Sequence, residues 1–167
     1  LVNSAEQQPQ VFVHRDFHAR NLMLLGSNDI GIIDFQDAVV GPLCYDLVSL
    51  YKDCYIRWPR HKVEQWVEEY RQLAVDKLKL PVASPEVFLK QFDLMGLQRH
   101  IKVLGIFARL YLRDGKTSYL KDLPLVLAYV RETCQQYSEF AAFDEWFETT
   151  LQPLIAEQSW NSAEGNA

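Results

Sequence analysis

The sequence contains few cysteines, and those present do not define a function class. Cys44, Cys54 and Cys134 are odd in number, and neither a CxxC spacing nor a histidine at ligand spacing accompanies them. They therefore indicate neither a disulfide framework nor a zinc site. We expect reduced thiols that are mostly packed in the interior.

Basic charge and long apolar runs are also scarce. The 17 Lys and Arg residues are outnumbered by 22 Asp and Glu, which gives a formal net charge of -5. No basic field is present to attract a phosphate backbone, so nucleic acid is not an expected partner. No apolar run is long enough to cross a bilayer, and the N-terminus lacks a signal pattern. We expect a cytoplasmic protein without membrane association that acts on small molecules.

Apolar residues are plentiful enough for a sizeable core. They make up 49% of the 167 residues, and aromatic residues make up 13%, so one compact unit is expected. The chain begins with Leu1 rather than Met and has a polar opening before the strand-like run 11–13, which favours a fragment of a longer protein. The tail 159–167 is rich in Asn, Ser, Ala and Gly and is expected to be disordered.

Two short apolar runs flank a turn sequence and predict a β-hairpin. The runs are 22–25 and 30–33, and Gly26-Ser27-Asn28-Asp29 lies between them. If Leu25 pairs with Ile30 across a four-residue turn, Asn21 and Asp34 lie opposite each other at the open end of the hairpin.

Helical periodicity dominates after Gly41-Pro42. One helix is expected from Leu43 to Cys54, ending before Pro59, and a second over 59–80. Ser84-Pro85-Glu86 provides a cap, a first-position proline and an acidic first turn, so a long helix is expected to begin there and reach Arg113. Asp114-Gly115-Lys116 breaks this helix. Two further helices are expected over 124–140 and 143–155.

The open end of the hairpin gathers polar groups that suit a hard cation. Opposed residues of an antiparallel pair lie roughly 5 Å apart, so the amide of Asn21 and the carboxylate of Asp34 can converge. Magnesium takes such oxygen ligands and usually keeps several waters and substrate phosphates. Asp16, five residues before Asn21, lies in a loop that should curl over the same end. It could accept a proton from an attacking hydroxyl.

The pattern H-x-D-x-x-x-x-N over 14–21, followed by Ile33-Asp34-Phe35, resembles the catalytic and metal loops of protein-kinase-like folds. His18 and the run Asp34-Phe35-Gln36-Asp37 are typical of the aminoglycoside phosphotransferase and choline kinase branch. The resemblance implies an α+β fold: a protein-kinase-like C-terminal lobe over residues 1–158, mostly helical, with a catalytic-loop hairpin.

Carried over by position, the resemblance gives each motif residue an expected role. Asp16 becomes the catalytic base, and Asn21 and Asp34 become the magnesium ligands. His18 would face the phosphate or the acceptor. Two residues would support the loop: His14 by hydrogen bonds from a buried position, and Asp46 through the loop backbone. ATP is the expected donor.

Other residues admit two interpretations. Asp37 is either a solvated carboxylate or a second metal or acceptor contact. Arg99 and Arg109 either pair with acidic residues of neighbouring helices or line an acceptor pocket and bind an anionic sugar. Trp58 and Trp66 either stack on a sugar face or pack in the core.

The similarity extends through 41–50 and 95–110, where the chain resembles the bacterial anomeric kinases that phosphorylate N-acetylmuramate and N-acetylglucosamine at C1 in cell-wall recycling. The sequence has no glycine-rich phosphate loop and no strand lysine for the donor phosphates, which the family carries in an N-terminal nucleotide-binding lobe. The expected function is ATP-dependent phosphorylation of an amino sugar. The alternatives are an aminoglycoside or choline-type kinase and a kinase-like binding module without catalysis.

Overall fold

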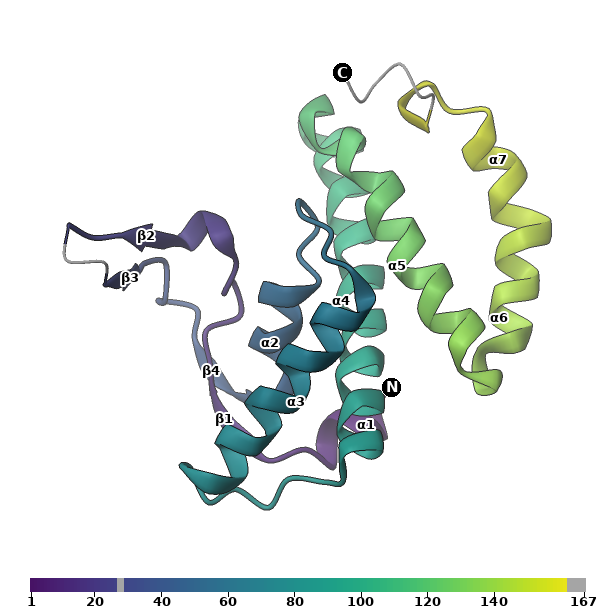
Figure 1. Ribbon diagram of the computed structural model, residues 1–167. Helices are drawn as coiled ribbons and strands as arrows, with labels where there is room; N and C mark the ends of the chain where they lie inside the picture. Colours follow the sequence, from purple (N-terminus) through teal and green to yellow (C-terminus); the bar gives the residue numbers. More distant parts are fainter. Residues whose placement is uncertain (27–28, 162–167) are drawn as a thin grey trace. The chain divides into compact units, whose positions relative to one another are not determined.

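The computed structural model describes residues 1–26 and 29–161 (Figure 1). Its internal contacts group into two compact units, one comprising Leu1–Gly96 and the other beginning at Leu97. The sequence led us to expect a single compact unit. The boundary of the predicted lobe at residue 158 stays a prediction, and the two units are described separately below.

The first unit contains two small antiparallel sheets of two strands each (Figure 1). Strand β1 (Gln10–Val13) pairs with β4 (Val39–Pro42), and β2 (Leu22–Leu24) pairs with β3 (Ile30–Ile32). A short helix that the sequence analysis did not predict, α1 (Val2–Glu6), precedes β1. The predicted hairpin is therefore present.

The register of this hairpin differs from the predicted one by one residue. Leu24 rather than Leu25 lies opposite Ile30, and Leu22 lies opposite Ile32. The Leu25 N–H donates to the carbonyl oxygen of Asp29 at 2.9 Å, so Leu25 belongs to the connection and not to the strand. Ser27 and Asn28 of the predicted turn lie outside the described residues. The predicted opposition of Asn21 and Asp34 is thus wrong by one position.

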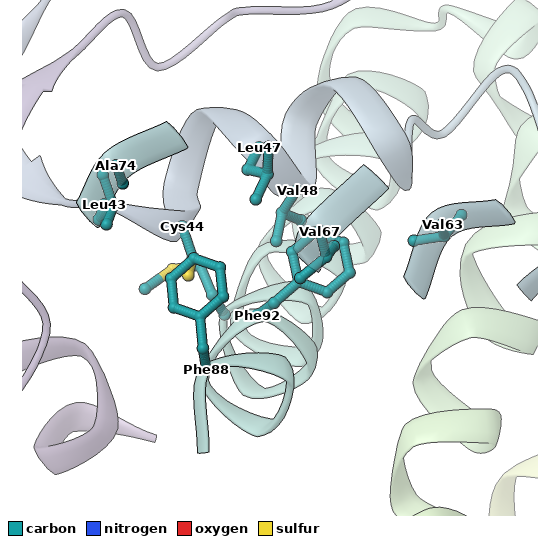
Figure 2. Packing of buried hydrophobic residues seen from close by; sticks show 10 residues of the cluster. Leu43, Cys44, Leu47, Val48, Val63, Val67, Ala74, Phe88 and Phe92 are labelled. Atoms are coloured by element: carbon teal, nitrogen blue, oxygen red, sulfur yellow. The ribbon is translucent and has the colours of Figure 1, made fainter. Parts of the chain in front are cut away.

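Three helices build the core of the first unit: α2 (Cys44–Tyr51), α3 (Arg60–Asp76) and the first part of α4 (Pro85–Asp114). Figure 2 shows Val48 of α2 near Val67 of α3 and the ring of Phe92 of α4, and the ring of Phe88, also of α4, close to Cys44. Phe92 and Val48 are completely buried. This core holds α2, the helix that follows β4, in place. Because β1 pairs with β4, the core also positions the strand that leads into the loop with Asp16.

The helix boundaries agree with the sequence analysis where strong signals exist. Helix α4 begins at Pro85 as predicted and ends at Asp114, where Gly115 takes a positive φ of 64°. Helix α2 ends earlier than predicted and leaves an irregular segment over 52–59. Helix α3 stops at Asp76 rather than Leu80, and Lys79 has a φ of 54°, in the left-handed region that no helix can include.

The second unit is helical throughout its described part. After α4 come a 3-10 segment η2 (Thr117–Asp122), α5 (Leu123–Gln136), η3 (Ser138–Phe140), α6 (Ala141–Trp146), a π-helical turn η4 (Phe147–Leu151), α7 (Gln152–Ala156) and η5 (Ser159–Asn161). A cluster of Leu97, Val130, Cys134 and Phe147 forms its core. The helix predicted over 143–155 is therefore interrupted by a wider turn.

Two further expectations concern the tail and the thiols. Residues 159–161 of the tail expected to be disordered form a 3-10 turn, and 162–167 lie outside the described residues. All three cysteines carry thiols, and Cys44 and Cys134 are buried, as predicted. Burial, with the nearby charge of Asp93, raises the pKa of Cys44, and burial raises that of Cys134 to about 11. None of the helices in 1–26 and 29–161 combines the length and apolar character needed to span a membrane.

Together these elements confirm an α+β architecture that is mostly helical and carries a hairpin next to the polar loops.

Candidate functional site

The structure brings Asp16, Asn21 and Asp34 together at the open end of the β2–β3 hairpin. The amide nitrogen of Asn21 donates to the backbone oxygen of Asp16 at 2.9 Å and lies 3.4 Å from Oδ2 of Asp34. Asn21 ends the short 3-10 turn η1 (Ala19–Asn21), and its carbonyl accepts from the N–H of Ile33. The two side chains meet although the register is shifted, because Asp34 bends away from the strand direction.

That bend is visible in the backbone of Asp34, whose φ is 68°. Arg15, next to Asp16, has a φ of 77°. Left-handed backbone at a residue other than glycine is uncommon and costs of order 1–3 kcal/mol, and such residues cluster at functional sites. One of these two residues is therefore the motif residue Asp34 itself, and the other directly precedes Asp16.

Asp46 and His14 form hydrogen bonds with the backbone near the loop that contains Asp16. Asp46, in the first turn of α2, accepts hydrogen bonds from the backbone N–H groups of His14 (2.6 Å) and Arg15 (3.0 Å). The ring of His14 is buried, and its Nε2 lies 2.9 Å from the carbonyl oxygen of Ile33. These contacts join the segment before Asp16 to the segment before Asp34. They are the contacts that the predicted supporting roles require.

Gln36 contacts the candidate metal ligand directly, and the sequence analysis did not single it out. Its side-chain N–H donates to Oδ1 of Asp34 at 2.7 Å. Because Asn21 lies beside Oδ2, both carboxylate oxygens of Asp34 have a polar neighbour. Gln36 could have been found from the run Asp34-Phe35-Gln36-Asp37, in which the glutamine lies two residues after the candidate metal ligand.

His18 lies in the catalytic loop with its ring edge-on to Tyr55, at a centroid separation of 6.2 Å. The guanidinium of Arg20 lies over the same tyrosine ring at 3.5 Å. Nδ1 of His18 is buried and has no hydrogen-bond partner among the described residues. Tyr55 therefore connects the irregular segment 52–59 to the loop that contains Asp16.

The remaining predicted contacts are not brought to the site by any described interaction. The Asp37 side chain is exposed, and its backbone oxygen accepts from Arg15 at 3.4 Å. Arg99 is buried and Arg109 is exposed, and both belong to the second unit. His100, the neighbour of Arg99, stacks on Tyr129 at a centroid distance of 4.7 Å. The acceptor roles of Asp37, Arg99 and Arg109 stay predictions.

The donor groups at the hairpin end suit a magnesium ion. Asp34 offers an exposed carboxylate, and Asn21 offers an amide, which are the hard oxygen donors that magnesium binds. The Asn21 amide nitrogen, not its oxygen, faces Asp34 here, so sharing a cation requires the amide to turn. Within the described part of the chain, no three His, Cys, Asp or Glu side chains are grouped to hold a metal ion.

A buried ion cluster that was not predicted from the sequence involves Lys52 and Arg60, at the two ends of the segment 52–59. Asp93 is fully buried and bonds to Nζ of Lys52 at 2.8 Å and to both terminal nitrogens of Arg60 at 2.6 and 2.8 Å. Burial alone would raise the pKa of Asp93, but the hydrogen bonds and charges of Arg60 and Lys52 hold it below its ordinary value. The sequence signal for this cluster was the position of Asp93 between the apolar residues Phe92 and Leu94.

Comparison with known proteins shows what this site is similar to. Residues 1–81, which include Asp16, Asn21 and Asp34, match the model of the phosphotransferase enzyme family, whose members have a protein-kinase-like fold. Among curated proteins, the N-acetylmuramate/N-acetylglucosamine kinase of Pseudomonas putida is 48% identical over 146 residues, which cover 87% of this chain and 42% of that protein. The kinase of the same name from Neisseria meningitidis serogroup B is 49% identical over 135 residues, 80% of this chain and 40% of that protein.

A kinase of the same name from Caulobacter vibrioides is more distant, at 34% identity over 151 residues. The chain spans about two fifths of the length of the curated relatives it matches.

Proposed function

We propose that the complete protein transfers the terminal phosphoryl group of ATP to a hydroxyl of an amino sugar, of the kind represented by N-acetylmuramate and N-acetylglucosamine. The observation that carries the proposal is the convergence of Asp16, Asn21 and Asp34 at one end of the hairpin, with Asp34 in a left-handed backbone conformation. The names of the relatives support the acceptor class.

Each residue has a distinct role in the proposed reaction. Asp16 accepts the proton of the attacking sugar hydroxyl, which raises the nucleophilicity of that oxygen. Asn21 and Asp34 would hold magnesium, which when bound neutralises the charge of the donor phosphates. Gln36 fixes one oxygen of Asp34 so that the other is directed toward Asn21.

The support of Asp46 serves the same chemistry. Phosphoryl transfer depends mainly on positioning and electrostatic stabilisation, so a base displaced by about 1 Å loses much of its effect. Asp46 holds the backbone just before Asp16, and His14 joins that backbone to the segment before Asp34, through buried or half-buried hydrogen bonds. His18 and Asp37 are proposed to contact the phosphate or the acceptor.

The test is turnover of the complete protein with magnesium and ATP over N-acetylglucosamine, N-acetylmuramate, an aminoglycoside and choline, with the phosphorylated product identified by mass spectrometry. Transfer to the amino sugars is expected. The variant Asp16→Asn should lower kcat by about 10² to 10⁴-fold and leave the KM for ATP nearly unchanged.

Asp76→Asn, at the exposed end of α3, is the matched control and should behave like the parent. Turnover of choline or an aminoglycoside in place of the sugars contradicts the acceptor class. An Asp16→Asn enzyme within a few-fold of the parent contradicts the role of the base.

A further inference from the structure

A pocket of about 440 Å³ lies beside the catalytic loop, entirely within the first unit. Its lining includes Ala19, Tyr51, Asp53, Ile56, Trp58 and Trp66. Volumes of roughly 300–1,000 Å³ with mostly apolar walls and few polar groups are typical of small-molecule sites. None of the roles assigned above uses this pocket.

The pocket adjoins the reacting groups through two contacts. Ala19, part of its wall, lies between His18 and Arg20 in the loop that follows Asp16. Both of these neighbours contact Tyr55, which belongs to the same segment 52–59 as three lining residues. The pocket wall is therefore linked to the loop that contains Asp16 in two ways: Ala19 belongs to both, and Tyr55 contacts the side chains of His18 and Arg20.

Asp53 is the acidic group of this pocket. It is 97% buried, since its relative exposure is 3%, and Oδ1 accepts only a weak hydrogen bond from the thiol of Cys54 at 3.5 Å. Oδ2 is buried and has no hydrogen-bond partner among the described residues. A buried carboxylate oxygen without a donor is energetically costly. A ligand that donates a hydrogen bond to this oxygen would remove that cost.

The aromatic residues of the pocket form one continuous wall. Trp66 lies between Tyr51, at a centroid distance of 5.3 Å, and Trp58, at 5.5 Å. These direct ring contacts make a continuous apolar wall. Such a wall suits the C–H face of a sugar ring.

We propose that this pocket binds the sugar acceptor, with Asp53 accepting a hydrogen bond from a sugar hydroxyl or amide N–H and Trp58 and Trp66 packing on the ring. The inference rests on the proposed function and adds the residues that would select the acceptor. Asp53 is a binding residue here, and Asp16 remains the base.

The experiment uses the complete protein and two separate readouts. The first is steady-state turnover with N-acetylglucosamine and ATP. Asp53→Asn should raise the KM for the sugar by about 10- to 100-fold, because it removes a charged hydrogen-bond acceptor, and Trp58→Ala should raise it by about 2- to 10-fold. The KM for ATP should stay unchanged in both variants, a split that general damage to the fold would not produce.

The second readout is direct binding of N-acetylglucosamine measured by intrinsic tryptophan fluorescence. The sugar should change the fluorescence of the parent, and Trp58→Phe should diminish that change. Trp146→Phe is the matched control, since Trp146 is similarly exposed but belongs to the second unit. Asp76→Asn serves as the control for Asp53→Asn, and thermal denaturation checks that each variant is folded.

The outcomes separate the two proposals. Turnover by the parent with an unchanged sugar KM in Asp53→Asn and Trp58→Ala overturns the pocket and leaves the function intact. Sugar binding that depends on Asp53 and Trp58 without turnover supports the pocket and contradicts the function. Absence of both turnover and sugar binding overturns both proposals, as does a pocket that binds choline or an aminoglycoside in preference to the sugar.

Discussion

At the scale of single residues, one carboxylate hydrogen-bonds to the backbone just before Asp16, the proposed base. The carboxylate of Asp46 accepts hydrogen bonds from the N–H groups of His14 and Arg15, and Arg15, which immediately precedes Asp16, has a left-handed backbone. Asp46→Ala removes both acceptors. We expect a loss of about 1–3 kcal/mol in the free energy of unfolding and a fall in kcat, measured by urea titration and by sugar phosphorylation.

Asp46→Asn is the informative companion to this variant. It keeps one carbonyl oxygen and should retain part of the stability while disturbing the loop that its second oxygen held. Unchanged turnover in Asp46→Ala would show that the loop holds its shape through His14 and the hairpin alone.

A second prediction at the residue scale concerns the buried cluster around Asp93 and the free energy of unfolding. Asp93→Asn removes the carboxylate charge that pairs with the buried ammonium of Lys52, and breaking a buried ion pair in this way typically costs about 3–5 kcal/mol. The free energy of unfolding, measured by denaturant titration at neutral pH, should fall by that order. Asp114→Asn, which breaks an exposed ion pair with Arg113, should change it little.

The same cluster sets a pH dependence. The folded pKa of Asp93 lies below its unfolded value, so its ionisation stabilises the fold fully above about pH 3.9 and ceases to do so as the pH falls through the folded pKa. Stability measured from pH 6 downward should therefore decline more steeply in the parent than in Asp93→Asn. Parallel declines would mean that other carboxylates dominate acid unfolding.

At the scale of elements, the β2–β3 hairpin is the least supported part of the first unit. Its strands are three residues long, and Met23, Leu24, Ile30 and Ile32 are all exposed. An isolated two-stranded hairpin is marginally stable in water. Amide hydrogen exchange of Met23 and Gly31 should thus be much faster than that of Val48 in the buried helix α2. Comparable protection in both elements would contradict this.

This exposure also explains why the hairpin register could not be predicted from the sequence. A buried face fixes register strongly, because a slip of one residue would turn the apolar set outward, but here both faces are exposed. Leu25 resembled a strand residue, although its N–H closes the connection through Asp29. By contrast, the start of α4 at Pro85 was predictable, since the cap, the proline and the acidic first turn act locally.

The residues near the candidate site likewise include some that could be predicted from the sequence and others that could not. Asp16, Asn21 and Asp34 were predictable because their spacing in the motif is local, and the structure brings them together. The place of Asp53 in a pocket with Ala19, the contact of Tyr55 with His18 and the partners of Asp93 were not predictable, since each joins segments distant in sequence. Lys52 and Asp93, for example, are 41 positions apart. Long-range pairs of this kind leave no periodic or spacing signal in one sequence.

At the scale of the whole molecule, the described strands present apolar pairs to solvent. Phe12 lies opposite Val40 in the β1–β4 pair, and Leu24 lies opposite Ile30 in the hairpin. The exposed fractions of Leu24 and Val40 reach 85% and 77%. Contiguous exposed apolar surface and open strand edges both favour association with another apolar surface.

We therefore predict that the polypeptide of residues 1–167, purified by itself, self-associates through these strands. Replacing Leu24 and Val40 by Lys should weaken the association by about tenfold or more, because each exposed side chain would otherwise be buried on contact, and like charges would then oppose pairing of the edges. Sedimentation velocity over a concentration series measures the effect. The control pairs Leu112→Lys with Leu154→Lys, which adds the same charge at exposed apolar positions of the second unit and should leave association unchanged. Equal association of both double variants and the parent, or a monomeric parent at every concentration, would refute the assignment of the strands as the associating surface.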